Sequence, residues 1–172
     1  MINMKKQHLE GILSKTLKYY SESETIWYLK LQNNPLAHHT TPADFLILTK
    51  TSRILIECKE TRTNTFAFDR ITQLYDLKQF YEIMLDNFAY ILICFWDTNI
   101  KKSDFYLIDA IVIERLITQI NKKSINRNEA KVWLEGYKLE TKNGYLNLDN
   151  TSVKQDGIVH IEKLQGYEIP YV

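Results

Sequence analysis

The sequence predicts a mixed α/β fold, with one central sheet flanked by helices. Helical and strand-like periodicities follow one another in the order helix, three strands, helix, strand, strand, helix. Residues 89–96 (AYILICFW) are apolar almost throughout, as expected of a strand buried on both faces. At 172 residues, 45% of them hydrophobic, the chain has the size and apolar content of one domain with a real core. We therefore expect residues 1–172 to form a single domain of the α/β or α+β class.

The first third of the chain supplies one helix and three strands. Apolar residues at helical spacing predict a helix over residues 8–20 whose buried stripe consists of Leu9, Ile12, Leu13, Leu17 and Tyr20. Residues 25–31 are rich in β-branched and aromatic types and predict a strand, whereas the Asn, Pro and His content of residues 33–42 predicts a loop. Residues 43–48 and 53–59 predict two further strands. The short turn between them indicates a hairpin at the centre of the domain.

The next element, residues 68–88, is predicted as a helix that is apolar around most of its circumference. The residues concerned are Ile71, Leu74, Tyr75, Leu77, Phe80, Tyr81, Met84 and Leu85. Such a helix should be covered on more than one side, and one of those covers could be a second subunit.

Beyond the buried strand, residues 104–109 are expected as its neighbour in the sheet, followed by a helix at residues 110–120. The signal then weakens. Residues 124–133 (SINRNEAKVW) are expected to open with a short helix, and Asn143-Gly144 is a good two-residue hairpin turn. Residues 158–164 (IVHIEKL) alternate like an edge strand.

Composition narrows the class of protein. No stretch approaches the roughly 18 apolar residues of a membrane span, and the lysine-bearing start lacks a signal peptide's apolar run, so we expect a cytoplasmic protein. Cys58 and Cys94 lie inside apolar runs and suggest neither a disulfide framework nor a zinc site. Because the net charge is only +1, any surface for nucleic acid must be a local patch. The candidate cations are Lys5, Lys6, Lys15, Lys18, Lys50, Arg53, Arg62, Lys101, Lys102, Lys122, Lys123, Arg127 and Lys131.

Two carboxylates and an ammonium can converge in the predicted hairpin. Asp44 lies at the head of one strand, and Glu57 and Lys59 lie at the end of the next. Side chains alternate along a strand, so Glu57 and Lys59 share a face while Cys58 points away into apolar packing. Mg²⁺ is typically held by one or two carboxylates plus waters and substrate oxygens, and a neighbouring lysine can act on the attacking water. The pattern is therefore suited to phosphodiester cleavage.

A simpler interpretation is that Glu57 and Lys59 form a solvent-facing ion pair on a half-exposed strand, which is a frequent and nearly neutral arrangement. The apolar run RILI directly before them favours the functional interpretation, because charges inside a central strand cost free energy unless something offsets them.

The same residues resemble a known signature. Pro42, Asp44 and the run IECK (residues 56–59) are similar to the motif of the PD-(D/E)xK nuclease superfamily, with one extra residue between proline and aspartate. The wider frame, consisting of ECKET (57–61), the Thr65-Phe66 loop and Gln73 on the next helix, resembles the RecU-type Holliday-junction resolvases from about residue 42 to residue 96. The basic segment KKSINRNEAKVW also looks like part of that family, and the archaeal Holliday-junction resolvases share the layout.

This resemblance implies a restriction-endonuclease-like fold and a homodimeric, Mg²⁺-dependent endodeoxyribonuclease, with Mn²⁺ as a substitute and branched four-way DNA as substrate. It implies the catalytic residues Asp44, Glu57, Lys59 and Gln73, and a metal set of Asp44, Glu57, Cys58 and Glu10. Glu10 corresponds to a first-helix glutamate that reaches the metal in these families. A surface glutamate favoured by the helix dipole is the alternative for Glu10, and an ordinary exposed helix glutamine is the alternative for Gln73.

The chain also departs from the family. RecU-type proteins carry a long projecting insertion before the aspartate, whereas only residues 32–43 fill that space here. A restriction-type or repair-type nuclease of the same fold, and a catalytically silent DNA-binding or assembly subunit, therefore stay open, although the intact site residues argue against the silent subunit. We expect His38 and His39 to be loop residues that contact phosphate, and Trp27, Trp96 and Trp133 to be core residues rather than base-stacking platforms.

Overall fold

A six-stranded mixed sheet forms the centre of the computed structural model, which describes residues 8–22, 26–32, 41–97 and 100–149. The strands lie in the order β1 (Trp27–Lys30), β2 (Phe45–Leu48), β3 (Arg53–Thr61), β5 (Asn87–Phe95), β6 (Asp104–Asp109) and β8 (Lys138–Leu139). Neighbouring strands are antiparallel except β3 and β5, which are parallel. The predicted mixed sheet is confirmed.

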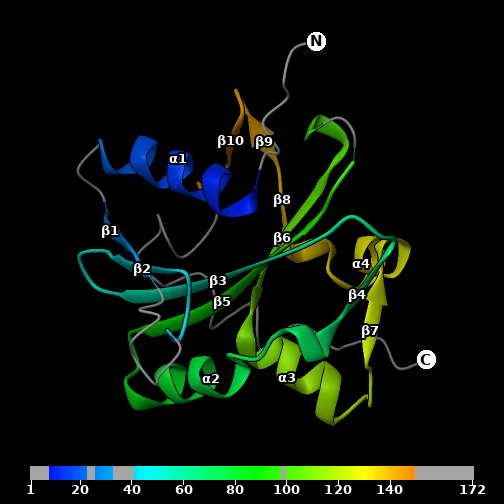
Figure 1. Ribbon diagram of the computed structural model, residues 1–172. Coiled ribbons are helices and arrows are strands. Elements are labelled where there is room, and N and C mark those ends of the chain that lie inside the picture. The colour runs from blue at the N-terminus through cyan, green and yellow to red at the C-terminus, as the bar shows by residue number, and fades with distance from the viewer. Residues whose placement is uncertain (1–7, 23–25, 33–40, 98–99, 150–172) are drawn as a thin grey trace.

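Helices cover both faces of this sheet (Figure 1). Helix α1 (Leu9–Ser21) lies on one face, and its five predicted stripe residues are all buried there. Helices α2 (Leu74–Ile83) and α3 (Ala110–Thr118) lie on the other face. Strand β5 lies between the two layers, so all nine of its residues are buried, as its apolar sequence predicts.

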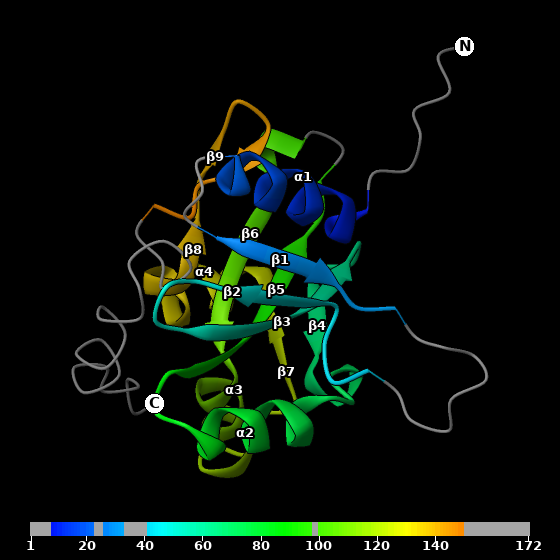
Figure 2. The same cartoon turned by 90° about the vertical axis from the view of Figure 1, so that its left-hand side faces the viewer.

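The central hairpin is also confirmed. The Thr49 amide donates to the Ser52 carbonyl at 2.9 Å and closes the turn, and Leu48 of β2 lies opposite Arg53 of β3. The β2–β3 ladder ends where Phe45 faces Ile56, whereas β3 continues beside β5 as far as Thr61. Beyond Ile56, the edge of β3 that faces β2 therefore has no described strand paired with it. Figure 2 shows β1, β2 and β3 side by side at this side of the molecule.

The helix predicted over residues 68–88 is wrong in its bounds. A 3-10 turn, η1 (Phe68–Arg70), precedes α2, and residue 88 already belongs to β5. The Asn87 side-chain amide donates to the Phe80 carbonyl at 2.8 Å and satisfies one of the acceptors at the end of α2. The end of the helix cannot be predicted from apolar periodicity, because Met84 and Leu85 continue the apolar pattern after the helix has ended.

Two further corrections concern the strands. The segment around Thr65 and Phe66 is not a loop but strand β4 (Thr65–Ala67), which pairs with β7 (Ser124–Asn126), and Phe66 is fully buried. Strand β7 therefore precedes the expected short helix, α4 (Arg127–Trp133), for which Asn126 provides a capping box. The Asn143-Gly144 turn is confirmed between β9 (Thr141–Lys142) and β10 (Tyr145–Leu146), with positive φ at both residues.

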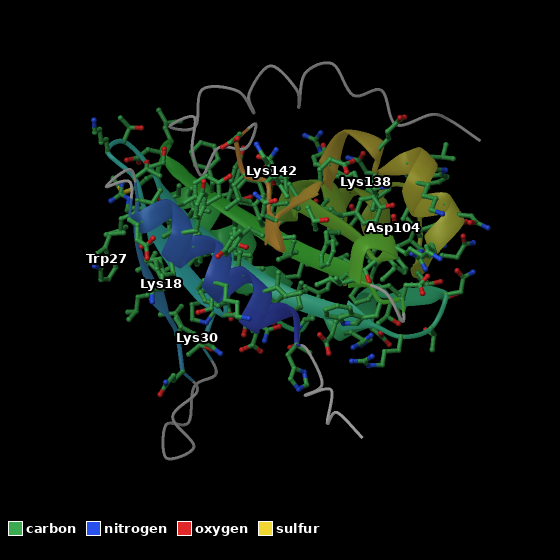
Figure 3. The ribbon with its side chains drawn as sticks, turned by 90° about the horizontal axis from the view of Figure 1, so that it is seen from above. Lys18, Trp27, Lys30, Asp104, Lys138 and Lys142 are labelled. Atoms are coloured by element: carbon green, nitrogen blue, oxygen red, sulfur yellow. The ribbon has the colours of Figure 1, made fainter. Side chains whose placement is uncertain are left out.

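Trp27 is not a core residue, because 54% of it is exposed. Tyr28 packs against the core on the α1 side, so strand alternation sends Trp27 to the opposite face of the outermost strand (Figure 3). Trp96 and Trp133 are partly buried against the core, in line with expectation. The histidines at positions 38 and 39 and the alternating segment 158–164 lie outside the described residues.

Short 3-10 turns at η2 (Ile100–Lys102) and η3 (Glu135–Tyr137) complete the described elements. Across the part of the chain that the structure describes, no helix is both long and apolar enough to cross a membrane.

Asp109 gives a first testable prediction about stability. It caps α3 by accepting the Ile111 amide at 3.0 Å, but it is buried, and its second oxygen has no hydrogen-bond partner among the described residues. Burial raises the pKa of Asp109 to about 6. A carboxyl whose pKa is higher in the folded state stabilises the fold at low pH, and this contribution is lost as pH rises through about 6.

We therefore expect Asp109→Asn to raise the free energy of unfolding at pH 7.5 by about 1–3 kcal/mol, because asparagine keeps the cap and cannot ionise. The gain should shrink at pH 5. Urea denaturation of both proteins at the two pH values measures it, and an equal difference at both would contradict the account.

Candidate active site

Asp44 lies directly before β2, at the point where that strand stops pairing with β3. Its amide donates to the Ile56 carbonyl at 3.1 Å, and its side-chain Oδ2 accepts the Cys58 amide at 2.7 Å. The carboxylate therefore caps the open edge of β3 in the plane of the sheet. This contact brings Asp44 beside the residues on either side of Cys58.

Glu57 and Lys59 share the face of β3 opposite α1, as alternation predicts. The Lys59 ammonium donates to Glu57 Oε1 at 2.5 Å and to Gln73 Oε1 at 3.3 Å. The Glu57 side chain is only 4% exposed and that of Lys59 only 16%, so the interpretation as a solvent-facing pair is wrong. Gln73 is half-buried just before α2 and is not an ordinary exposed helix glutamine.

The two carboxyl groups of the site interact. Burial raises the pKa of Glu57 to about 7, against the opposing effect of the Lys59 hydrogen bond, and the nearby Asp44 charge raises it further. Burial likewise raises the pKa of Asp44, although the Cys58 amide lowers it. The hydrogen bond between the two acids raises the pKa of Glu57 and lowers that of Asp44. Two buried acids in contact are difficult to ionise together unless a cation joins them.

Glu10 lies on the α1 side of the same strand. Its carboxylate pairs with the Lys30 ammonium at 2.7 Å, and its charge raises the pKa of Asp44, which places it within electrostatic range of that carboxylate. Figure 3 shows Lys30 on β1 beside α1. Together with Gly11, Cys58 and other residues, Glu10 and Lys30 line a cleft of about 570 Å³.

Cys58 meets the site through its main chain. Its side chain packs against the core on the α1 side, and burial raises the pKa of its thiol well above the ordinary value, so a thiolate ligand is disfavoured. In a strand, the amide and carbonyl of one residue point to the same side. The Cys58 carbonyl therefore lies on the edge where its amide meets Asp44.

These groups suit a hard divalent cation. Within the described residues, no three His, Cys, Asp or Glu side chains form a ready-made metal cluster. Mg²⁺ does not need one, because it keeps several waters and is commonly bound by one or two carboxylates plus substrate phosphate oxygens. Asp44, Glu57 and the Cys58 carbonyl would supply the protein's share.

Comparison with known proteins adds little. No family model and no curated protein matches the sequence. Among solved structures, Hjc of Archaeoglobus fulgidus is similar. Hjc is a Holliday junction resolvase from an archaeal hyperthermophile; the match has 12% sequence identity and a TM-score of 0.43, and it covers 69% of this chain and 87% of that chain. A likeness this distant says nothing about activity.

Several predicted cations already have partners. Arg53 binds Asp86, Lys122 binds Glu129, and Arg127 binds Asp104, which also binds Lys138 (Figure 3). These pairs tie elements together and leave less charge for an external phosphate. The predicted cations that form no ion pair with another described residue are Lys15, Lys18, Lys50, Arg62, Lys102, Lys123 and Lys131.

Sequence reasoning missed two residues beside the site. Lys30 ends an otherwise apolar strand, which was a visible signal, but its place beside Glu10 depends on how α1 packs. Glu60 follows Lys59 on β3 and points to the α1 side, where it contacts the Leu9 amide at 3.0 Å. Strand alternation could have placed Glu60 on that face, but not its partner 51 residues away.

Proposed function

We propose that this protein is a metal-dependent DNA endonuclease that hydrolyses phosphodiester bonds at the site formed by Asp44, Glu57, Lys59 and Gln73. The observation that carries the proposal is the burial of Glu57 against a second carboxylate, with the Lys59 ammonium bonded to it. Such an arrangement is poor for stability, because the acids repel each other and lose hydration. It is useful where a divalent cation and a phosphate complete it.

Asp44, Glu57 and the Cys58 carbonyl would hold Mg²⁺, which would supply positive charge next to the phosphate and make a bound water more acidic. With a cation bound, the Glu57 carboxylate would be shared between the cation and the Lys59 ammonium that now donates to it. The Lys59 ammonium can then orient the attacking water or donate to a phosphate oxygen as negative charge develops. Gln73 keeps a hydrogen bond to Lys59 and holds the ammonium at the site. Glu10 supports the metal site from the α1 side.

We further propose a two-fold homodimer acting on branched DNA. The support is the sequence resemblance together with an exposed apolar surface, here called the α2 patch, formed by Tyr75, Ile83, Met84 and Leu85. Leu85 is completely exposed and Ile83 is 73% exposed. Clustered exposed apolar side chains are typical of interaction surfaces. A four-way junction needs two symmetric nicks, which the two sites of a closed dimer can deliver.

The test compares labelled four-way junction with linear duplex of matched sequence, with and without Mg²⁺. A junction resolvase should nick the junction symmetrically and leave the duplex intact. Equal cleavage of both substrates would favour a restriction-type or repair-type nuclease. If the protein bound DNA but did not cleave it in any divalent metal, it would be a catalytically silent DNA-binding subunit and not a nuclease.

Metal affinity should depend on pH. Because the pKa of Glu57 is raised to about 7, a proton must leave before Glu57 binds the cation. The Kd for Mg²⁺ should therefore rise by about tenfold for each pH unit below 7, and it should be nearly constant above pH 8. Calorimetric titration of DNA-free protein between pH 6 and pH 8.5, in buffers of different ionisation enthalpy, measures both affinity and proton release. A flat affinity across that range would contradict the role of Glu57.

A further inference from the structure

Glu60 makes an unusual set of contacts for a residue next to an active-site lysine. It points to the α1 face of β3, where its Oε2 atom accepts the Leu9 amide and the Trp96 indole N–H, both at 3.0 Å. Its Oε1 atom lies 3.6 Å from His8 Nδ1. Figure 1 shows the start of α1 directly above β3 and β5. One side chain of β3 thus contacts both the first turn of the helix and the residue that directly follows β5.

Helix α1 does not cap this end by itself. His8 occupies the N-cap position in an extended conformation and makes no side-chain capping bond. The first amides of a helix have no partner within the helix, and a carboxylate near them is also favoured by the helix dipole. Glu60 therefore supplies from a distant strand the cap that the local sequence lacks.

The capped amide is next to a residue of the site. Leu9 is buried and fixed by Glu60, and Glu10 follows it. The Glu10 carboxylate contacts Lys30 and raises the pKa of Asp44. Groups around a metal must be held within about half an ångström of their working geometry. The Glu60 contact sets the place of the helix turn from which Glu10 extends.

We propose that Glu60 is a positioning residue of the nuclease site, which holds the first turn of α1 on β3 so that Glu10 faces the cation bound by Asp44 and Glu57. The inference rests on the proposed function. It assigns no direct contact between Glu60 and the metal or the DNA.

The contacts of Glu60 allow the effect of its side-chain length to be distinguished from the effect of its charge. Both hydrogen bonds end on one oxygen atom, so the amide oxygen of glutamine can accept both without a charge. Glu60→Gln should keep cleavage within about threefold of wild type, whereas Glu60→Asp keeps the charge but is too short and should lose about 10- to 100-fold, as other supporting residues of metal sites do. If Asp preserved activity and Gln did not, charge rather than position would matter, and the proposal would be wrong.

A double-mutant cycle tests the route through Glu10. In a Glu10→Ala background, Glu60→Asp should cause less than about a threefold further loss, because the residue that it positions is absent. Glu22→Ala, an exposed change at the opposite end of α1, is the control and should change cleavage in neither background. Equal losses from Glu60→Asp in both backgrounds would overturn the positioning role. Thermal melts of each variant identify any loss caused by unfolding.

Hydrogen exchange separates this inference from the proposed function. The Leu9 amide should exchange faster in Glu60→Asp than in wild type and should stay protected in Glu60→Gln, whether or not the protein cleaves DNA. If the wild-type protein never cleaved DNA, the proposed nuclease function would be wrong. The exchange rate of the Leu9 amide would still show whether Glu60 holds the first turn of α1. If the Leu9 amide exchanged at the wild-type rate in Glu60→Asp, the positioning role of Glu60 would be wrong even in an active enzyme.

Discussion

Asp44→Asn, Glu57→Gln and Lys59→Ala are each expected to reduce DNA cleavage by about 10³-fold or more. The first two changes remove negative charge that the cation requires, and the third removes the ammonium that acts on the water or the phosphate. DNA binding should change by less than about threefold, since cations elsewhere on the surface hold the phosphates. Any change caused by removing a carboxylate should be towards tighter binding, because it lessens repulsion of the phosphates. Nicking and gel-shift assays on the same labelled junction, titrated with Mg²⁺, measure both quantities.

The variants should remain folded. Burial raises the pKa of Glu57 to about 7, so the neutral acid is already partly populated near neutral pH, and the neutral glutamine should be tolerated in its place. Glu82→Gln on α2 and Lys142→Ala on the β9–β10 hairpin are matched controls at exposed positions and should cut at the wild-type rate. Glu10→Gln should lose less than the three main variants. Wild-type cleavage by Lys59→Ala would remove the central argument for the enzyme.

Local patterns were sufficient for the elements that hold this site. The α1 stripe and the apolar β5 run report burial directly, because each residue's environment follows from the period of its own element. The short turn between β2 and β3 fixes their register, which brings Asp44 to the Cys58 amide next to Glu57. The approach of these two acids was therefore predictable from the sequence.

Long-range contacts were not predictable in this way. Strand β4 depends on pairing with β7, about sixty residues further along the chain, so the Thr65-Phe66 segment resembles a loop when examined alone. Similarly, α2 ends where Asn87 from the following strand satisfies the Phe80 carbonyl. The hydrogen bond from the Leu9 amide to Glu60 and the ion pair of Glu10 with Lys30 depend on how α1 packs on the sheet. Such partners have no periodic signature.

The observed α2 leaves a smaller apolar surface to be covered than the predicted helix did. As a helix of 21 residues, the segment 68–88 would have needed cover on several sides. The observed α2 is shorter and buries Leu77, while the exposed apolar residues gather at Tyr75 and from Ile83 to Leu85, where the chain leaves the helix. The proposed second subunit would therefore cover the α2 patch. Its outermost side chains make little contact within one protomer, so they can be changed without disturbing the fold.

We expect the double change Ile83→Glu and Leu85→Glu to convert a dimer into a monomer at micromolar concentration. Two charges facing their symmetry mates would be desolvated and opposed by like charge, which costs several kcal/mol per interface. The matched control is Val132→Glu, because Val132 is 70% exposed on α4, away from the α2 patch. Light scattering should report half the mass for the double variant only. Paired nicking of a four-way junction should then be lost, while the thermal midpoint of the protomer and slow single nicking persist. A wild-type protein that is monomeric at this concentration, or a double variant that remains dimeric, would exclude the α2 patch as the interface.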